Sequence, residues 1–241
     1  MAAKSSPLSK VESIVNSIMG VQTEEAKQRG ASGTDVDGVA IAIYIGGTAV
    51  QIAMMMAILW GLQLITLRLS NGVQVGVAIA FFTVVSIRSR LFSPLNNART
   101  RTTYSNVVRP GWAPPPLAFP IIWMSIGVLR VISSYLVWQT LGHAYFSLPL
   151  ALFMVHLALG DTWNTIFTVE GRLGAAVPVV LVGPLASSIV IVASYWRVVS
   201  LAGQLLLPMA VWLAVASALV ISIWRLNGAE PLYPIHLDDS P

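Results

Sequence analysis

Long apolar runs dominate the chain, and charged residues fall almost only between these runs. A helix needs about 20 apolar residues, at about 1.5 Å of rise per residue, to cross the hydrocarbon core of a membrane. Together with the turn signals between them, the runs predict six membrane-spanning helices, at residues 39–67, 73–92, 116–139, 148–168, 174–195 and 204–226. The expected fold class is an all-α integral membrane protein with six spans.

The first 37 residues follow a different pattern. Apolar side chains recur there at helical spacing, and Ser9 and Glu12 form a capping box in front of them. The apolar positions are Val11, Ile14, Val15, Ile18 and Met19. This predicts a short amphipathic helix on the membrane surface or against a partner, with a frayed tail as the alternative. The segment has no apolar core typical of a secretory signal peptide.

The basic residues are distributed unevenly between the two sides of the predicted bundle. One side holds the N-terminal tail, the loops after the second and fourth spans, and the C-terminus. It carries eleven of the 14 Lys and Arg: Lys4, Lys10, Lys27, Arg29, Arg88, Arg90, Arg99, Arg101, Arg109, Arg172 and Arg225. Because positively charged loops favour the cytoplasmic side, this supports an even number of spans. It predicts that both termini face the cytosol, or the stroma or matrix of an organelle.

The composition narrows the function classes. Charged residues make up 10% of the chain and hydrophobic residues 56%, whereas soluble domains carry roughly 25% charged residues. This excludes a soluble globular protein, a disordered chain and a nucleic-acid binder with a broad basic face. The absence of cysteine excludes disulfides, thiolate metal sites and a cysteine nucleophile. No acid–base pair, metal-ligand spacing or Gly-rich phosphate loop stands out, so we expect no catalytic residue and no metal site.

Three ionisable or imidazole groups lie in the membrane interior, away from the ends of the predicted spans, where such groups are candidates for function. They are Arg130, His156 and Asp161. Counting the rise per residue puts Arg130 and Asp161 about 12 Å apart in depth, and Arg130 level with His156. We therefore expect Arg130 to lie beside His156 or to extend outwards. For Asp161 we expect an arginine of the basic loop as partner: Arg99, Arg101 or Arg109.

Several motifs occur in a fixed order between residues 73 and 228. The loop 109–115 reads RPGWAPP and is followed by FPIIW at 119–123, SYLVW at 134–138, DTWN at 161–164, LLLP at 205–208 and WRLN at 224–227. This series resembles the TspO/MBR family, which includes translocator proteins and tryptophan-rich sensory proteins. The resemblance implies a five-helix bundle at 69–228. The tail 1–37, an extra transmembrane helix at 38–68 and a C-terminal tail at 229–241 would be additions to it.

The resemblance also implies a ligand site inside the bundle, beneath the proline-rich loop. Members of the family bind tetrapyrroles such as protoporphyrin and haem, and sterols or drugs in animals. The implied ligand-binding residues are Trp112, Pro114, Pro115, Phe119, Trp123, His156, Asp161, Trp163, Phe167 and Trp212. Helical counting places Trp123, Asp161 and Trp163 at one depth, within about 10 Å of the basic side. Flat aromatic walls with a few polar groups suit a large planar ligand.

Two function classes follow from these observations. The first is a membrane protein that binds or carries a lipophilic ring, either porphyrin-like or sterol-like. The second is a non-catalytic subunit of a larger photosynthetic or respiratory complex built on the same scaffold. An enzyme that degrades porphyrin is a weaker third reading. No cofactor is required by the sequence, although porphyrin, haem, chlorophyll, carotenoid or lipid could be bound.

The expected partners are membrane lipids, a hydrophobic small molecule, and a second copy of the chain or a larger complex, but no nucleic acid. The expected location is an organelle membrane of a plastid or mitochondrion.

Overall fold

The computed structural model describes residues 30–95 and 107–238. Its helices and short helical turns are α2 (Gly38–Thr66), α3 (Asn71–Arg88), η1 (Ser89–Phe92), α5 (Ala118–Thr140), α6 (Leu148–Asn164), η2 (Thr165–Val169), α7 (Leu173–Val180), η3 (Leu181–Leu185), α8 (Ala186–Val198) and α9 (Ser200–Leu226). Within the described residues, six continuous helical segments are long and apolar enough to cross a membrane. The prediction of an all-α, six-span membrane protein is confirmed, and the spans begin and end within a few residues of the expected positions.

Helix ends follow local chemistry. The Oδ1 atom of Asp37 accepts a hydrogen bond of 2.9 Å from the backbone N–H of Ala40, which caps the first turn of α2. Pro149 stands in the first turn of α6, where a missing N–H costs nothing. Gly171 adopts φ +70° between η2 and α7, a conformation that favours glycine in a tight turn.

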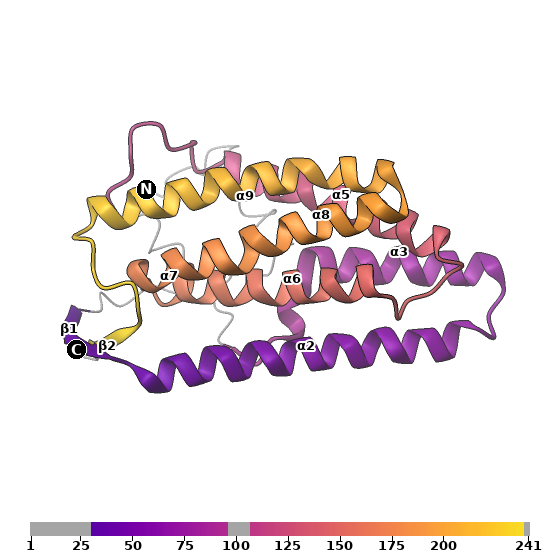
Figure 1. The fold of residues 1–241 in the computed structure, drawn as a ribbon, viewed down its shortest axis with the longest axis horizontal. Coiled ribbons are helices and arrows are strands. Elements are labelled where there is room, and N and C mark those ends of the chain that lie inside the picture. Colours follow the sequence, from indigo (N-terminus) through magenta and orange to yellow (C-terminus); the bar gives the residue numbers. More distant parts are fainter. Residues whose placement is uncertain (1–29, 96–106, 239–241) are drawn as a thin grey trace, which may run out of the picture.

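The helices form a bundle in which α6 is the central element and α2 a peripheral one (Figure 1). In the most apolar stretch of the span Leu148–Val169, 67% of the residues are buried inside the protein. The corresponding share for Gly38–Thr66 is 22%. Figure 1 shows α2 running along one side of the bundle, where it packs against α6. Helices α8 and α9 form a close hairpin, and a Cβ atom at Gly203 would lie 2.6 Å from the Cβ atom of Trp196.

Two spans contain a π-helical turn that the sequence pattern does not predict. In the fourth span α6 continues into η2, and in the fifth span η3 separates α7 from α8. Pro184 lies inside η3, and a proline removes one backbone hydrogen bond and crowds the preceding turn. The wider π turn accommodates this defect within a continuous span.

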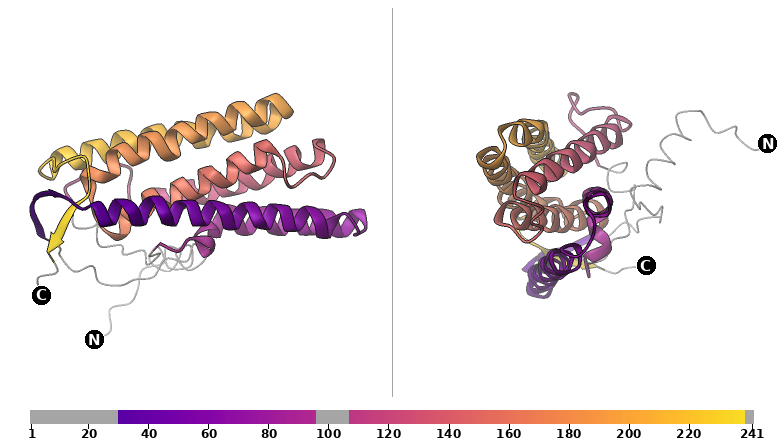
Figure 2. Two further views of the ribbon diagram at one scale, coloured as in Figure 1. Left: turned by 60° about the horizontal axis from the view of Figure 1, so that its bottom comes forward. Right: turned by 90° about the vertical axis from the view of Figure 1, so that its right-hand side faces the viewer.

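A short antiparallel strand pair joins the two ends of the described chain. Strand β1 (Gly30–Val36) pairs with β2 (Ile235–Asp238), with Ala31 opposite Leu237 and Val36 opposite Ile235. Both segments had been interpreted as parts of tails. The pair lies at one end of the bundle, as the left view in Figure 2 shows. The amphipathic helix expected around residues 9–19 lies outside the described residues.

Four segments far apart in sequence meet at the end of the bundle that carries the strands. The backbone N–H of Asp37 donates to the carbonyl oxygen of Pro234 at 2.8 Å. Arg172, in the loop between η2 and α7, reaches Asp37 at 2.9 Å, and the loop residue Val108 bonds to Asn227 after α9. The two termini of the described chain and these two loops therefore share one side, as the charge distribution predicted.

Candidate functional site

An aromatic cluster fills the interior beneath the proline-rich loop. The rings of Trp163 and Phe167 stack with 5.8 Å between centroids and 7° between planes. They are four residues apart on one face of the fourth span. The ring of Phe119, at the start of α5, meets Trp212 of α9 edge-on at 5.7 Å. Phe119 and Trp123 pack against the core that contains Trp163 and Phe167. Four predicted aromatic residues therefore contribute to one core region, and Trp212 contacts it through Phe119.

Three polar groups in and beside this cluster lack a partner among the described residues. The Nε1 atoms of Trp163 and Trp212 and the Nδ2 atom of Asn164 are buried without a hydrogen bond. The side chain of Trp163 is only 9% exposed. A buried donor that is left unpaired costs about 1–3 kcal/mol. These N–H groups are therefore suited to a ligand that brings hydrogen-bond acceptors.

The proline-rich loop is bound to the end of α9 and reaches the aromatic cluster. The side-chain amide of Asn227 donates to the carbonyl oxygen of Val108 and accepts from its N–H, each at 2.9 Å. Val107 and Ala113 pack against the cluster. Of the predicted loop residues, Pro114 is half-buried, whereas Trp112 and Pro115 are exposed. The loop thus contacts the cluster through Val107 and Ala113, while Trp112 and Pro115 face outwards.

A cationic group lies next to the aromatic cluster, inside the bundle. The Nη2 atom of Arg130, from α5, is 3.1 Å from Nε2 of His156 on α6, as depth counting predicted. The Nε atom of Arg130 donates to Sδ of Met209 on α9 at 3.2 Å. The Cζ atom of Arg130 lies 5.9 Å from the ring centre of Trp123, so a cation–π contact links this group to the aromatic side chains.

The hydrogen bonds of His156 define its tautomer. A guanidinium can only donate, so Nε2 of His156 accepts from Arg130. The proton of the neutral ring is then on Nδ1, which lies 2.8 Å from Oγ of Ser187. The hydroxyl of Ser187 donates in turn to the carbonyl oxygen of Gly183 at 2.7 Å. Arg130, His156, Ser187 and the carbonyl group of Gly183 in η3 therefore form a row of hydrogen bonds. Each side chain in this row donates to the next group.

Asp161 lies on a different face of α6 from the aromatic residues. Residues two positions apart in an α-helix are rotated by about 160° around its axis. Asp161 and Trp163 therefore lie at a similar depth but point to different neighbours. The carboxylate of Asp161 accepts from Nε2 of Gln51 at 2.8 Å and pairs with Nε of Arg90 at 3.4 Å. Of the expected partners, Arg99 and Arg101 lie outside the described residues. The observed ion-pair partner, Arg90, follows α3 and was not among the candidates.

The contacts between α2 and α6 were missed by sequence reasoning. Gln51 also donates to the carbonyl oxygen of Ser89 at 3.2 Å, and Thr48 bonds to Thr162. Tyr44, one turn earlier, donates to Glu170. A signal was present, because Tyr44, Thr48 and Gln51 are spaced three and four residues apart and form one polar stripe on an otherwise apolar helix.

Comparisons with known proteins agree with these observations. The sequence model of the TspO/MBR family matches residues 78–225, which is more than half of the chain. The Translocator protein of Sus scrofa is 32% identical over 155 residues, which cover 62% of this chain and 89% of that protein.

Two bacterial proteins show similar levels of identity. Protein CrtK of Rhodobacter capsulatus is 33% identical over 128 residues, 53% of this chain and 79% of its own length. The Tryptophan-rich sensory protein of Cereibacter sphaeroides is 30% identical over 131 residues, 53% of this chain and 78% of its own length. Helix α2 and the strand pair lie outside the range that the family model matches. The match covers most of the remaining five spans, and this chain belongs to the TspO/MBR family.

Proposed function

We propose that this protein binds a lipophilic ring ligand of the tetrapyrrole class inside the bundle, beneath the loop 107–117. The observation that carries the proposal is the indole N–H of Trp163, which is buried beside the stacked ring of Phe167 and has no hydrogen-bond partner within residues 30–95 and 107–238. A planar ring with nitrogen or carboxylate acceptors could stack on these aromatic faces and accept from this donor. A purely aliphatic ligand would leave the donor unsatisfied.

The proposed role is binding or carriage rather than catalysis. The relatives are named as translocator and sensory proteins, which supports this role. The proposed ligand residues are aromatic side chains without acid–base chemistry of their own. The excess of basic residues on one side supports an orientation with both termini on the cytosol, stroma or matrix side. An organelle membrane, plastid or mitochondrial, remains part of the proposal.

The direct test is titration of protoporphyrin IX into the purified protein in mild detergent, followed by absorbance and by tryptophan fluorescence. We expect saturable binding by the unchanged protein. The variant Trp163→Phe keeps an aromatic ring but loses the N–H, and we expect about five- to tenfold weaker binding.

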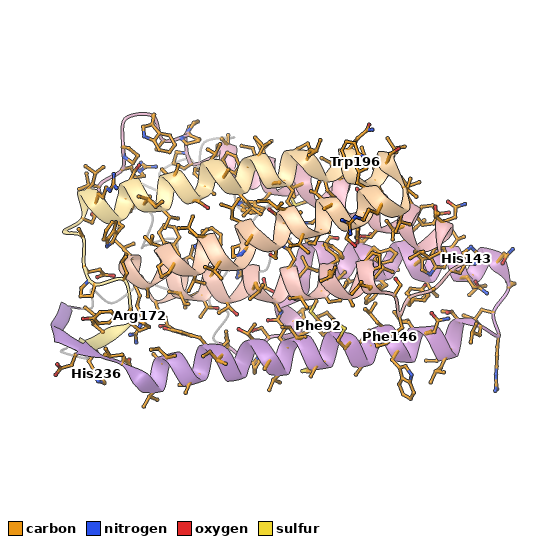
Figure 3. All side chains as sticks on the ribbon, in the orientation of Figure 1. Phe92, His143, Phe146, Arg172, Trp196 and His236 are labelled. Atoms are coloured by element: carbon orange, nitrogen blue, oxygen red, sulfur yellow. The ribbon has the colours of Figure 1, made fainter. Side chains whose placement is uncertain are left out.

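The matched control is Trp196→Phe, because Trp196 lies at the opposite end of the bundle from Arg172 and the strands (Figure 3). Its affinity should equal that of the unchanged protein. No saturable binding, or an equal effect of both substitutions, would contradict the proposal.

The second candidate is a non-catalytic subunit of a larger photosynthetic or respiratory complex. The observation that favours it is α2, which lies outside the matched range and exposes apolar residues along its length: Val39, Ile43, Val50, Trp60 and Leu64. Native gel electrophoresis of membranes solubilised in mild detergent distinguishes the two. Migration within a large complex that is lost when Ile43 and Val50 are replaced by Ser favours the second candidate, whereas migration as a monomer or small dimer excludes it.

A further inference from the structure

Arg130 differs from Arg90 and Arg172, which also make buried contacts in the described part of the chain. Arg90 pairs with Asp161 at 3.4 Å, and Arg172 pairs with Asp37 at 2.9 Å. Among residues 30–95 and 107–238, no carboxylate lies within ion-pair distance of Arg130. Its contacts are a thioether, a neutral imidazole and an indole ring, from Met209, His156 and Trp123. None of these groups neutralises the positive charge.

A cation in such surroundings is costly, because burial removes water and the carboxylate that acts on it, that of Asp161, lies beyond ion-pair distance. A guanidinium has five N–H donors, and the contacts to Met209 and His156 use two of them. The three that remain can bind one more acceptor in the two-pronged geometry that a carboxylate favours. The site therefore has both the charge and the donors for an organic anion.

The position of Arg130 indicates where this anion would come from. Trp123 packs against both hydrophobic cores of the bundle, and its ring faces the guanidinium. One of these cores contains Trp163 and Phe167. Trp123 therefore connects the aromatic cluster with Arg130, and an acidic substituent of a ring stacked on that cluster would reach the guanidinium by extending past Trp123.

We propose that Arg130 binds a carboxylate carried by the lipophilic ring ligand, and that His156 positions the guanidinium. This rests on the proposed function and adds a chemical requirement to it, namely an acidic substituent on the ring. His156 contributes by its tautomer: Oγ of Ser187 accepts a hydrogen bond from Nδ1–H, which leaves Nε2 as the acceptor for Arg130. The guanidinium is thereby oriented before the ligand arrives.

The test compares two ligands with the same ring, protoporphyrin IX with free carboxylates and its dimethyl ester without them, using the full-length protein in mild detergent. We expect the unchanged protein to bind the free acid about tenfold more tightly than the ester. In Arg130→Gln this preference should disappear, mainly through weaker binding of the acid. Arg197→Gln, which changes an exposed arginine at the end of α8, should keep the preference unchanged.

Each outcome has a separate meaning. If neither ligand binds the unchanged protein, the proposed function fails. If both bind with equal affinity, the proposed function survives and the role of Arg130 is overturned. This comparison needs no variant, so it remains decisive even if Arg130→Gln fails to fold. His156→Leu should reduce the preference for the acid and leave binding of the ester unchanged, whereas a merely structural role would weaken both.

A fatty acid could supply the same carboxylate, and a third arm separates this source. Saturating palmitate should leave the affinity for protoporphyrin IX unchanged if the anion belongs to the ring. Competition by palmitate that Arg130→Gln abolishes would assign the site to a fatty acid and overturn the proposal for a ring-borne carboxylate.

Discussion

The carboxylate of Asp37 binds Nη2 of Arg172 at 2.9 Å, across 135 residues of sequence. The same arginine donates to the carbonyl oxygen of Ile235 at 2.6 Å and pairs with Glu170. One side chain therefore holds together the start of α2, the loop before α7 and the strand β2. Asp37 also caps α2 through Ala40, so it couples the additional helix to the family bundle.

This relationship predicts a pH-dependent stability. The pKa of Asp37 is lowered, first by the backbone N–H of Ala40 and also by Arg172, while burial opposes the shift. A lowered folded-state pKa stabilises the folded protein above the unfolded value of about 3.9, and this contribution is lost as the pH falls through the folded-state pKa. In thermal unfolding between pH 7 and pH 3, Asp37→Ala should be less stable at pH 7 by about 1 kcal/mol or more.

The difference between Asp37→Ala and the unchanged protein should shrink toward pH 3. Asp35→Ala serves as the control, because Asp35 is exposed two residues away. A destabilisation that is equally large at both pH values would show that the charge of Asp37 is not responsible.

A second prediction concerns the attachment of α2. Gln51→Leu removes the hydrogen bonds to Asp161 and to the carbonyl oxygen of Ser89 and leaves buried acceptors with fewer donors. We expect a loss of about 2 kcal/mol of folding stability, measured by thermal unfolding in detergent. Gln139→Leu, an exposed site on α5, is the matched control and should change stability by less than about 0.5 kcal/mol.

The third prediction separates stability from ligand binding at Asp161. Asp161→Asn removes the negative charge that pairs with Arg90 at 3.4 Å, and breaking a buried pair in this way costs about 3–5 kcal/mol. Because the carboxylate points away from Trp163, the affinity for protoporphyrin IX at a temperature where the variant is folded should change by less than about twofold. A large loss of affinity with unchanged thermal stability would instead identify Asp161 as a ligand contact.

A fourth prediction uses one substitution at two glycines. At Gly203 a Cβ atom would lie 2.6 Å from Cβ of Trp196, whereas at Gly76 nothing lies within 4 Å. Gly203→Ala should therefore separate α8 from α9 and destabilise the protein by about 1–3 kcal/mol. Gly76→Ala should stabilise α3 by up to about 1 kcal/mol, since alanine is the better helix former. Shifts of the same sign in the two unfolding temperatures would contradict this assignment of the close contact.

Much of this arrangement could be predicted because a helix has a constant rise and a constant angle per residue. Constant rise correctly placed Arg130 beside His156, and the family motifs correctly grouped Phe119, Trp123, Trp163 and Phe167. The contacts of Asp161 with Gln51 and Arg90 could not be predicted in this way, since they depend on which segments pack beside α6. Arg90 and Gln51 come from segments whose positions no local pattern specifies.

The strand pair was missed for a different reason. The β1 sequence GASGTDV has no alternation of apolar and polar residues, and its backbone partner is about 200 residues away. Strand pairing of this kind depends on both segments meeting at the same end of the bundle, which only the complete fold determines. The roles of all ten predicted residues as ligand contacts remain predictions for the titrations above.

The single direction of donation from Arg130 through His156 and Ser187 has a consequence for proton movement. The row ends at the carbonyl oxygen of Gly183, a group that accepts a hydrogen bond but does not take up and release protons under ordinary conditions. A proton relay through a membrane needs an ionisable or hydroxylic group at each step. The irregular turn around Pro184 therefore closes this row within the bundle, so the row can hold a charge in place without conducting protons across the membrane.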